Sequence, residues 1–262
     1  MKDEALRIAG KITEPTARIN ILREYVQACI LRSLHEAEAF QALSFVGGTC
    51  LRFIYNLPRF SEDLDFSLEQ EPREPVSVWF SKVRRDLNFL GFEADVTLNV
   101  KKTVYVAWIG IPRLMSEARL TDIQEQRLSV KAEIDSRPPA GARFEARLVN
   151  RHTLFAIRHH DLPSLLAGKI HAICTRPYAK GRDWYDLVWY LSLRPPIFPN
   201  SELLRNAFAQ TSPDLESQSW QEMIIEAAER SDFEAIRRDV NPFLERPEEA
   251  RFLTREYIRT LL

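Results

Sequence analysis

Two short stretches of the chain carry residue types suited to binding a nucleotide. In Gly47-Gly48-Thr49, a glycine pair follows an apolar strand and opens a helix, so the backbone can approach a ligand and direct N–H groups at an anion. The Thr49 hydroxyl could contact the same anion. In Asp63-Leu64-Asp65, residues i and i+2 of a strand face one side, so the two carboxylates project together. Paired carboxylates suit divalent cations in phosphoryl and nucleotidyl transfer, which predicts a metal site at Asp63 and Asp65.

Each stretch alone has a simpler explanation: the glycine pair could be only a turn, and the two aspartates only a solvated strand face. Their combination, joined by one short helix, is a far more specific signal of nucleotide chemistry. The chain resembles the AbiEii/AbiGii toxin family of the nucleotidyltransferase superfamily, which includes the MenT toxins. The resemblance is carried by the glycine turn, by Leu51-Arg52 and by the sequence RFSEDLDF at residues 59–66. The resemblance implies NTP as substrate, Mg²⁺ or Mn²⁺ as cofactor, and transfer of NMP to an acceptor hydroxyl. It also implies nucleotide contacts from Gly47, Gly48, Thr49, Arg52 and Ser61, supported by Arg59.

A third carboxylate is expected from the alternating stretch Leu128–Asp135. Its apolar residues face inward, and nucleotidyltransferase folds take another metal ligand from a neighbouring strand. Glu133 is the first choice and Asp135 the second. Either residue could instead form a structural ion pair with Lys131 or Arg127.

A lysine lies inside the apolar stripe of the helix predicted over 161–174. Buried there, Lys169 needs an anion to compensate its lost hydration, and a triphosphate is the partner that this pattern favours over outward snorkelling. Replacing Lys169 with Met is therefore expected to preserve folding.

The segment after Lys169 resembles the second motif of the same family, a Lys followed by Arg-Asp-x-x-Asp-Leu at a helix start. The resemblance implies that Lys169 contacts phosphate and that Asp183 completes the active site as general base. Asp183 read alone could simply stabilise the helix dipole. Asp186 is expected to hold Arg182 or Arg176 in place.

An arginine-rich segment is the candidate surface for an RNA acceptor. Five Arg and one acid lie between Arg137 and His160, a pattern suited to a phosphate backbone, although a merely solvated basic surface explains it equally well. The resemblance implies the 3′ end of tRNA as acceptor and a toxin restrained by a cognate antitoxin, in a toxin–antitoxin or phage-defence system. A small-molecule nucleotidyltransferase and a non-catalytic nucleotide-binding module are the alternatives.

The elements that must position these residues form a mixed α/β half and a helical half. The predicted fold is α+β, a nucleotidyltransferase-like mixed sheet with flanking helices and a helical C-terminal lobe. Its domains are residues 1–160, with an N-terminal helix, and residues 161–262. Predicted helices cover 16–39, 50–56 and 76–90; predicted strands cover 43–46, 63–68, 93–100, 103–111, 128–135 and 153–158.

Composition excludes several other classes of protein. The chain has 262 residues, and 36 Lys and Arg against 37 Asp and Glu give a net charge of −1, so it is not basic overall. No apolar run approaches the roughly 20 residues of a membrane span, and the acidic start is unlike a signal peptide. Three scattered cysteines favour a reducing cytoplasm over a disulfide framework. The aromatic residues of 184–190 are expected in the core.

Overall fold

The computed structural model describes residues 1–101, 103–212 and 219–262, which divide into two compact units. Unit 1 comprises Met1–Tyr55, Phe60–Arg137 and Ala146–His159. Unit 2 comprises Asn56–Arg59, Pro138–Glu145 and His160–Leu262. The second unit thus takes two short segments from the part of the chain before residue 160, in addition to the helical part that follows it.

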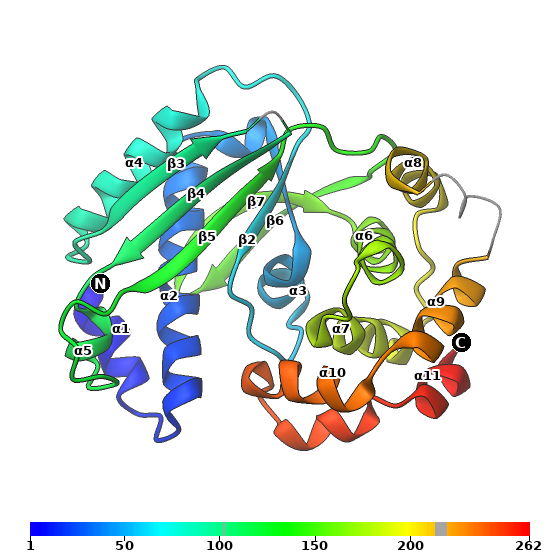
Figure 1. The fold of residues 1–262 in the computed structure, drawn as a ribbon. Coiled ribbons are helices and arrows are strands. Elements are labelled where there is room, and N and C mark those ends of the chain that lie inside the picture. Colours follow the sequence, from blue (N-terminus) through cyan, green and yellow to red (C-terminus); the bar gives the residue numbers. More distant parts are fainter. Residues whose placement is uncertain (102, 213–218) are drawn as a thin grey trace. The chain divides into compact units, whose positions relative to one another are not determined.

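The described residues form one seven-stranded sheet in the order β3-β4-β5-β2-β1-β7-β6. β2 pairs antiparallel with β1 and parallel with β5, while β3, β4 and β5 form an antiparallel meander. This mixed sheet with flanking helices confirms the predicted α+β class (Figure 1). The strands are β1 Leu43–Val46, β2 Leu64–Leu68, β3 Asp95–Val100, β4 Val104–Ile111, β5 Leu128–Asp135, β6 Phe144–Arg151 and β7 Thr153–His160.

The two faces of the central strands differ in the way the alternating sequence predicts. Leu64 and Phe66 of β2 are buried, as are all four apolar residues of β5 from Leu128 to Ile134. Asp65 and Glu133 lie on the opposite, more accessible face. Helices α2 and α4 lie behind the sheet in Figure 1 and pack against each other, with α2 contacting β5 and α4 contacting β3. The polar face is therefore available for ligand chemistry.

The long helix α2 of unit 1 begins at a clear start signal in the sequence. In α2, Pro15 occupies the first turn and the carboxylate of Glu14 accepts a hydrogen bond from the Thr16 N–H at 2.9 Å. The helix α3 begins at Gly47 itself, so the glycine pair belongs to its first turn. The helices of unit 1 are α1 Lys2–Ala9, α2 Pro15–Glu36, α3 Gly47–Tyr55, α4 Val76–Phe89 and α5 Leu114–Glu117, with a short 3₁₀ helix η1 at Ala39–Gln41.

Unit 2 is mainly helical, and three of its helices end two or three residues before a proline, namely Pro177, Pro195 and Pro242. Helix α6 packs against α7, α8 and α9, and α10 packs against α7. No helix in the described part of the chain has the length and hydropathy of a membrane span. The helices are α6 Leu162–Thr175, α7 Gly181–Ser192, α8 Ser201–Thr211, α9 Trp220–Arg230, α10 Phe233–Val240 and α11 Arg255–Leu261, with 3₁₀ helices η3 at Asn241–Phe243 and η4 at Pro247–Phe252.

Candidate active site

The sheet register places the carboxylates of two neighbouring strands side by side. Asp65 of β2 is the direct partner of Glu133 of β5, whereas Asp135 faces Ser67. Asp63 precedes the first residue of β2. Glu133 thus lies nearer to the Asp-x-Asp pair than Asp135 does. The Asp135 carboxylate instead accepts a hydrogen bond from the Arg137 N–H at 2.9 Å, which holds the turn after β5.

The glycine turn fits around the carboxylate of Asp65. Gly47 has a φ of +76°, and a Cβ added there would overlap the Asp65 carboxylate. A glycine is therefore required both by the backbone conformation and by the close approach. The Asp65 carboxylate thus lies against the first turn of α3, where the helix dipole favours negative charge. Phosphate binding by Gly47 and Gly48 stays a prediction.

Two residues predicted to bind nucleotide have structural partners instead. Thr49 is fully buried, and its hydroxyl donates to the Asp63 carbonyl, so it positions the metal-ligand candidate and is not directed at a phosphate. Arg52 is also buried; it donates to Glu24 at 2.6 Å and stacks over the Phe60 ring. These buried bonds give both residues a supporting role, and their contact with a nucleotide stays a prediction.

Sequence reasoning missed two residues of α2 that hold this region. The Gln27 amide donates to the carbonyls of Ser61 and Glu62, at 3.1 and 2.9 Å, and so fixes the loop that leads to Asp63. Glu24 is 4% exposed and accepts from Arg52, Arg151 and His152. Burial alone would raise the pKa of Glu24, but His152 and the two guanidinium groups lower it to about 2. The only sequence signal for Gln27 and Glu24 was that each is a polar residue on the buried side of a helix.

A lysine ammonium already lies among the carboxylates of unit 1. Lys131 Nζ is 2.9 Å from Glu133. This is the structural ion pair that was the alternative role for Glu133 from the sequence. Burial alone would lower the pKa of Lys131; Glu133, Asp63 and Asp65 outweigh it and raise the pKa. The residues of β2 and β5 therefore create a local field that attracts a cation.

A preformed cage for a metal is not part of this arrangement. Among the described residues, no group of three His, Cys, Asp or Glu side chains is arranged to hold an ion. Mg²⁺ usually takes only one or two protein carboxylates and completes its shell with substrate phosphates and water. Asp63 and Asp65 fit that pattern.

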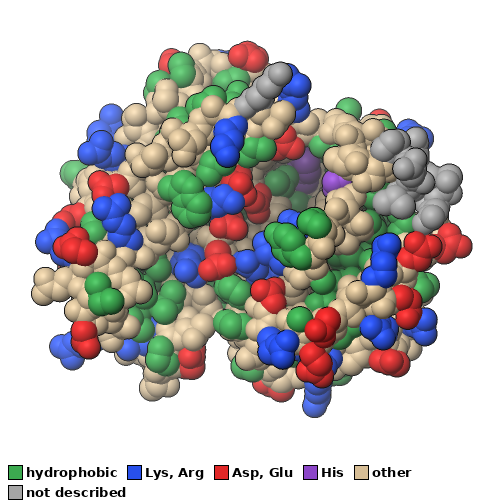
Figure 2. Space-filling model, viewed as in Figure 1, with side chains coloured by type: hydrophobic (Ala, Val, Ile, Leu, Met, Phe, Trp, Pro, Cys, Tyr) green, Lys and Arg blue, Asp and Glu red, His purple; other side chains and the backbone are tan. Residues whose placement is uncertain are grey.

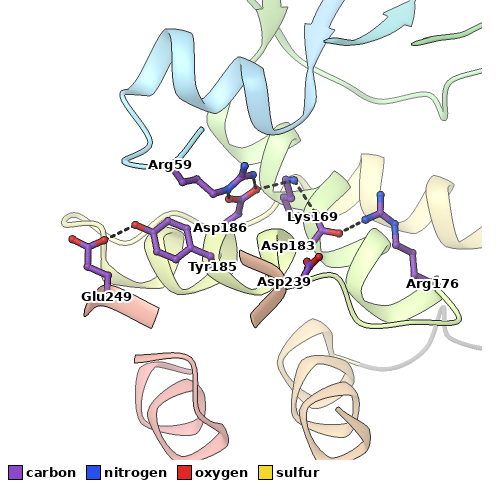
Figure 3. Close-up of polar contacts among 9 residues, drawn as sticks. Arg59, Lys169, Arg176, Asp183, Tyr185, Asp186, Asp239 and Glu249 are labelled. Carbon is purple, nitrogen blue, oxygen red and sulfur yellow. Dashed lines mark hydrogen bonds and ion pairs between the residues drawn. The ribbon is translucent and has the colours of Figure 1, made fainter. Parts of the chain in front are cut away.

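In unit 2, Lys169 lies in a buried chain of alternating charges (Figure 3). Its ammonium is 2.9 Å from Asp183 and 2.8 Å from Asp186. Asp186 in turn accepts two hydrogen bonds from Arg59, both at 2.6 Å, and Asp183 accepts one from Arg176. The predicted anionic compensation of Lys169 thus comes from two carboxylates of the chain. Asp186 is also corrected: it holds Arg59 and Lys169, and Arg176 pairs with Asp183.

The electrostatics of this chain of charges bear on the role of Asp183. Burial alone would raise the pKa of Asp183, but Lys169 and Arg176 lower it to about 2. Burial would lower the pKa of Lys169, and Asp183 and Asp186 outweigh it to raise the pKa. A carboxylate that is so reluctant to accept a proton is a weak general base at neutral pH. This arrangement favours Asp183 as an anchor for Lys169.

The start of α7 is fixed by close packing. A Cβ at Gly181 would overlap the Ile236 carbonyl of α10, and the Gly181 N–H donates to Asp239 at 2.7 Å. The Arg182 guanidinium lies over the Phe243 ring, 4.3 Å from its centre. The aromatic side chains that follow are buried as expected, namely Trp184, Tyr185 and Tyr190.

The arginine-rich segment contains a strand that its sequence did not indicate. Phe144–Arg151 forms β6, the edge strand. Arg147 and Arg151 donate to the Ile54 and Arg52 carbonyls at the end of α3, at 3.0 and 2.8 Å. These two arginines thus stabilise unit 1 internally. On the face in view in Figure 2, basic and acidic side chains are interspersed over the surface.

Comparison with known proteins gives one family match and several similar folds. The family described as "Nucleotidyl transferase AbiEii toxin, Type IV TA system" matches residues 29–255. No curated protein matches the sequence.

Among solved structures, MenT4, a nucleotidyltransferase toxin from Mycobacterium tuberculosis H37Rv, is similar with a TM-score of 0.64 and 20% identity. The match covers 100% of this chain and 89% of that chain. JHP933 from Helicobacter pylori has a TM-score of 0.51 and 16% identity, with 92% and 91% covered. A putative nucleotidyltransferase from H. pylori has a TM-score of 0.50 and 16% identity, with 95% and 96% covered. These likenesses support the same fold.

Proposed function

The chain belongs to the AbiEii family of nucleotidyltransferase toxins of type IV toxin–antitoxin systems, and from this we propose that it transfers NMP from an NTP to a hydroxyl of an RNA acceptor. The acceptor we propose is the 3′ end of tRNA, and the setting is the cytoplasm, where both substrates are present. Membership of a toxin–antitoxin family implies an antitoxin as partner.

One observation carries the proposal for the chemistry. Asp65 lies against the glycine turn of α3 and opposite Glu133 of β5, with Asp63 immediately before the same strand. The carboxylates therefore share one sheet face, where the buried core behind β2 and β5 fixes their register. Rigid placement of this kind is what nucleotidyl transfer needs, because its catalysis is mostly positioning and electrostatic stabilisation.

The metal proposed for this site is Mg²⁺ or Mn²⁺, held by Asp63 and Asp65. When bound, it would neutralise charge on the phosphates of the NTP. Glu133 is the proposed third ligand, and the Lys131 ammonium that now pairs with it would hold that carboxylate in the absence of metal. The Thr49 hydroxyl donates to the Asp63 carbonyl and so restrains the backbone of this proposed ligand.

The proposed role of Lys169 is to contact the triphosphate. It is restrained by Asp183 and Asp186, so its ammonium is pre-oriented, and Arg59 shares the charge of Asp186. Preorganised cations of this kind stabilise charge without reorganising during the reaction. The role proposed for Asp183 is accordingly that of a positioning residue for Lys169 and Arg176.

The experiment that tests this function uses the full chain with total RNA, Mg²⁺ and each of the four labelled NTPs in turn. We expect one or more NTPs to label RNA of tRNA size, and chelation of the divalent ion to abolish labelling. Release of pyrophosphate without labelled RNA would move a small-molecule acceptor to first place. Absence of NTP turnover under every condition would refute the proposal in favour of a nucleotide-binding module.

A further inference from the structure

A cavity of about 520 Å³ is lined only by residues of unit 2. Its walls come from the end of α6, the connection from Arg176 to Lys180, the start of α7, and the junction of α9 and α10. This volume is typical of a site for a nucleotide-sized ligand. Lys169 does not line this cavity, whereas Asp183 and Arg176, which anchor Lys169 through Asp183, do.

The charged groups that line the cavity leave an excess of positive charge. Its three cations are Arg176, Lys180 and Arg230, and its two carboxylates are Asp183 and Asp232. Asp183 is already paired with Arg176 and Lys169. Asp232 accepts from two backbone N–H groups at the start of α10, which commits its side chain to capping the helix. Two cations therefore remain for a ligand.

Lys180 and Arg230 are these two cations. Within the described residues, neither side chain has a hydrogen bond or an ion pair. Burial lowers the pKa of Lys180, and the neighbouring Arg182 and Arg176 lower it further. Asp183 offsets part of this effect, and an added anion would compensate the remaining positive charge around the partly buried ammonium. The cavity is thus electrostatically complementary to a negatively charged group.

An exposed aromatic ring lies at the same cavity. Tyr178, in the connection between α6 and α7, lines it and is 66% exposed. Tyrosine of such exposure beside separated cations is the combination with which proteins bind single-stranded nucleic acid, since the ring stacks on a base and the cations contact successive phosphates. An NTP is less well matched, because its phosphates are consecutive and carry a metal for which the cavity has no uncommitted carboxylate.

We propose that this cavity binds the single-stranded 3′ end of the RNA acceptor, with Lys180 and Arg230 on phosphates and Tyr178 stacked on a base. The inference rests on the proposed function for its substrate class. It assigns acceptor recognition to residues of unit 2 other than those of the arginine-rich segment of 137–160.

The test is binding of a fluorescent single-stranded RNA oligonucleotide with a free 3′ hydroxyl to the full chain over a series of salt concentrations. We expect Lys180→Met and Arg230→Ala each to weaken binding about tenfold at low salt. Each should also reduce the slope of log K against log salt by roughly 0.7, the value for one phosphate contact on a single strand. Tyr178→Ala should weaken binding and leave the slope unchanged. Lys180→Arg should retain binding, which separates charge from folding.

The matched control is Arg205→Ala, which removes an exposed arginine of α8 outside the cavity. It should leave both affinity and slope unchanged. Unaltered RNA binding in Lys180→Met and Arg230→Ala would overturn the inference, as would a loss of NTP affinity with RNA affinity intact. A third outcome is possible: the parent chain binds RNA through the cavity but labels no RNA with any NTP. That result would contradict the proposed function and leave the inference about the cavity standing.

Discussion

Asp65 of β2 lies directly opposite Glu133 of β5 in a parallel pairing, and Asp135 lies opposite Ser67 two residues further along. The distinction matters because both acids alternate onto the same strand face, so the sequence could not choose between them as a third metal ligand. The register favours Glu133, because Glu133 is level with Asp65 whereas Asp135 is level with Ser67.

Glu133→Gln is therefore expected to raise the Mg²⁺ concentration for half-maximal transfer by about 10–100-fold. Asp135→Asn should leave this concentration nearly unchanged, because that carboxylate holds the turn at Arg137. A Mg²⁺ titration of the transfer rate measures both. Equal effects of the two substitutions would show that Glu133 serves only as the partner of Lys131.

Lys169→Met is expected to destabilise the protein, which reverses the expectation from the sequence. The ammonium is 2.9 Å from Asp183 and 2.8 Å from Asp186, so its removal leaves two buried carboxylates undercompensated. Breaking a buried pair costs about 3–5 kcal/mol, and the remaining bonds from Arg59 and Arg176 favour the lower end. Chemical denaturation measures the loss, with the exposed Lys11→Met as control. A variant as stable as the parent would show that the two aspartates do not need Lys169.

The buried carboxylate of Glu24 predicts a loss of stability in acid. Its folded pKa of about 2 lies below the ordinary value near 4.3, so its contribution is present above the ordinary value and disappears as the pH falls through the folded one. The contribution is about 3 kcal/mol by linkage. Glu24→Gln should be less stable at pH 7 and show a shallower decline between pH 4.3 and 2. The measurement is the free energy of unfolding of parent and variant at several pH values over that range. If it declines equally steeply with falling pH in Glu24→Gln and in the parent, the assignment is contradicted.

The arginines of β6 provide a test that separates structure from RNA binding. Arg147→Glu and Arg151→Glu each remove a charged hydrogen bond to a carbonyl at the end of α3, and should cost roughly 1.5–3 kcal/mol. Arg143→Glu, at an exposed residue of the same segment, should melt like the parent. Normal melting of all three variants with weakened RNA binding would restore this segment as the RNA surface.

The sequence predicted those elements that have one buried face, because their apolar residues recur at the spacing of a helix or a strand. Strands 43–46 and 128–135 have the predicted bounds, and the helix predicted over 76–90 starts at Val76, whereas α3 starts at Gly47, three residues before its predicted start. β6 was missed because only Val149 of its eight residues is buried, so an edge strand carries no alternating apolar pattern. Partners far apart in the chain were beyond prediction, since no spacing rule links Arg59 to Asp186 or Thr49 to the Asp63 carbonyl.

The central claim, nucleotidyl transfer at the paired aspartates of β2, is tested most directly by transfer of labelled NMP to RNA by Asp65→Asn. The substitution keeps the size of the side chain and removes its charge beside the glycine turn. Ser67→Ala is the matched control on the same strand face, because its buried hydroxyl has no hydrogen bond partner in the described structure. We predict that Asp65→Asn loses transfer at unchanged melting temperature while Ser67→Ala retains it; full transfer by folded Asp65→Asn would contradict the claim.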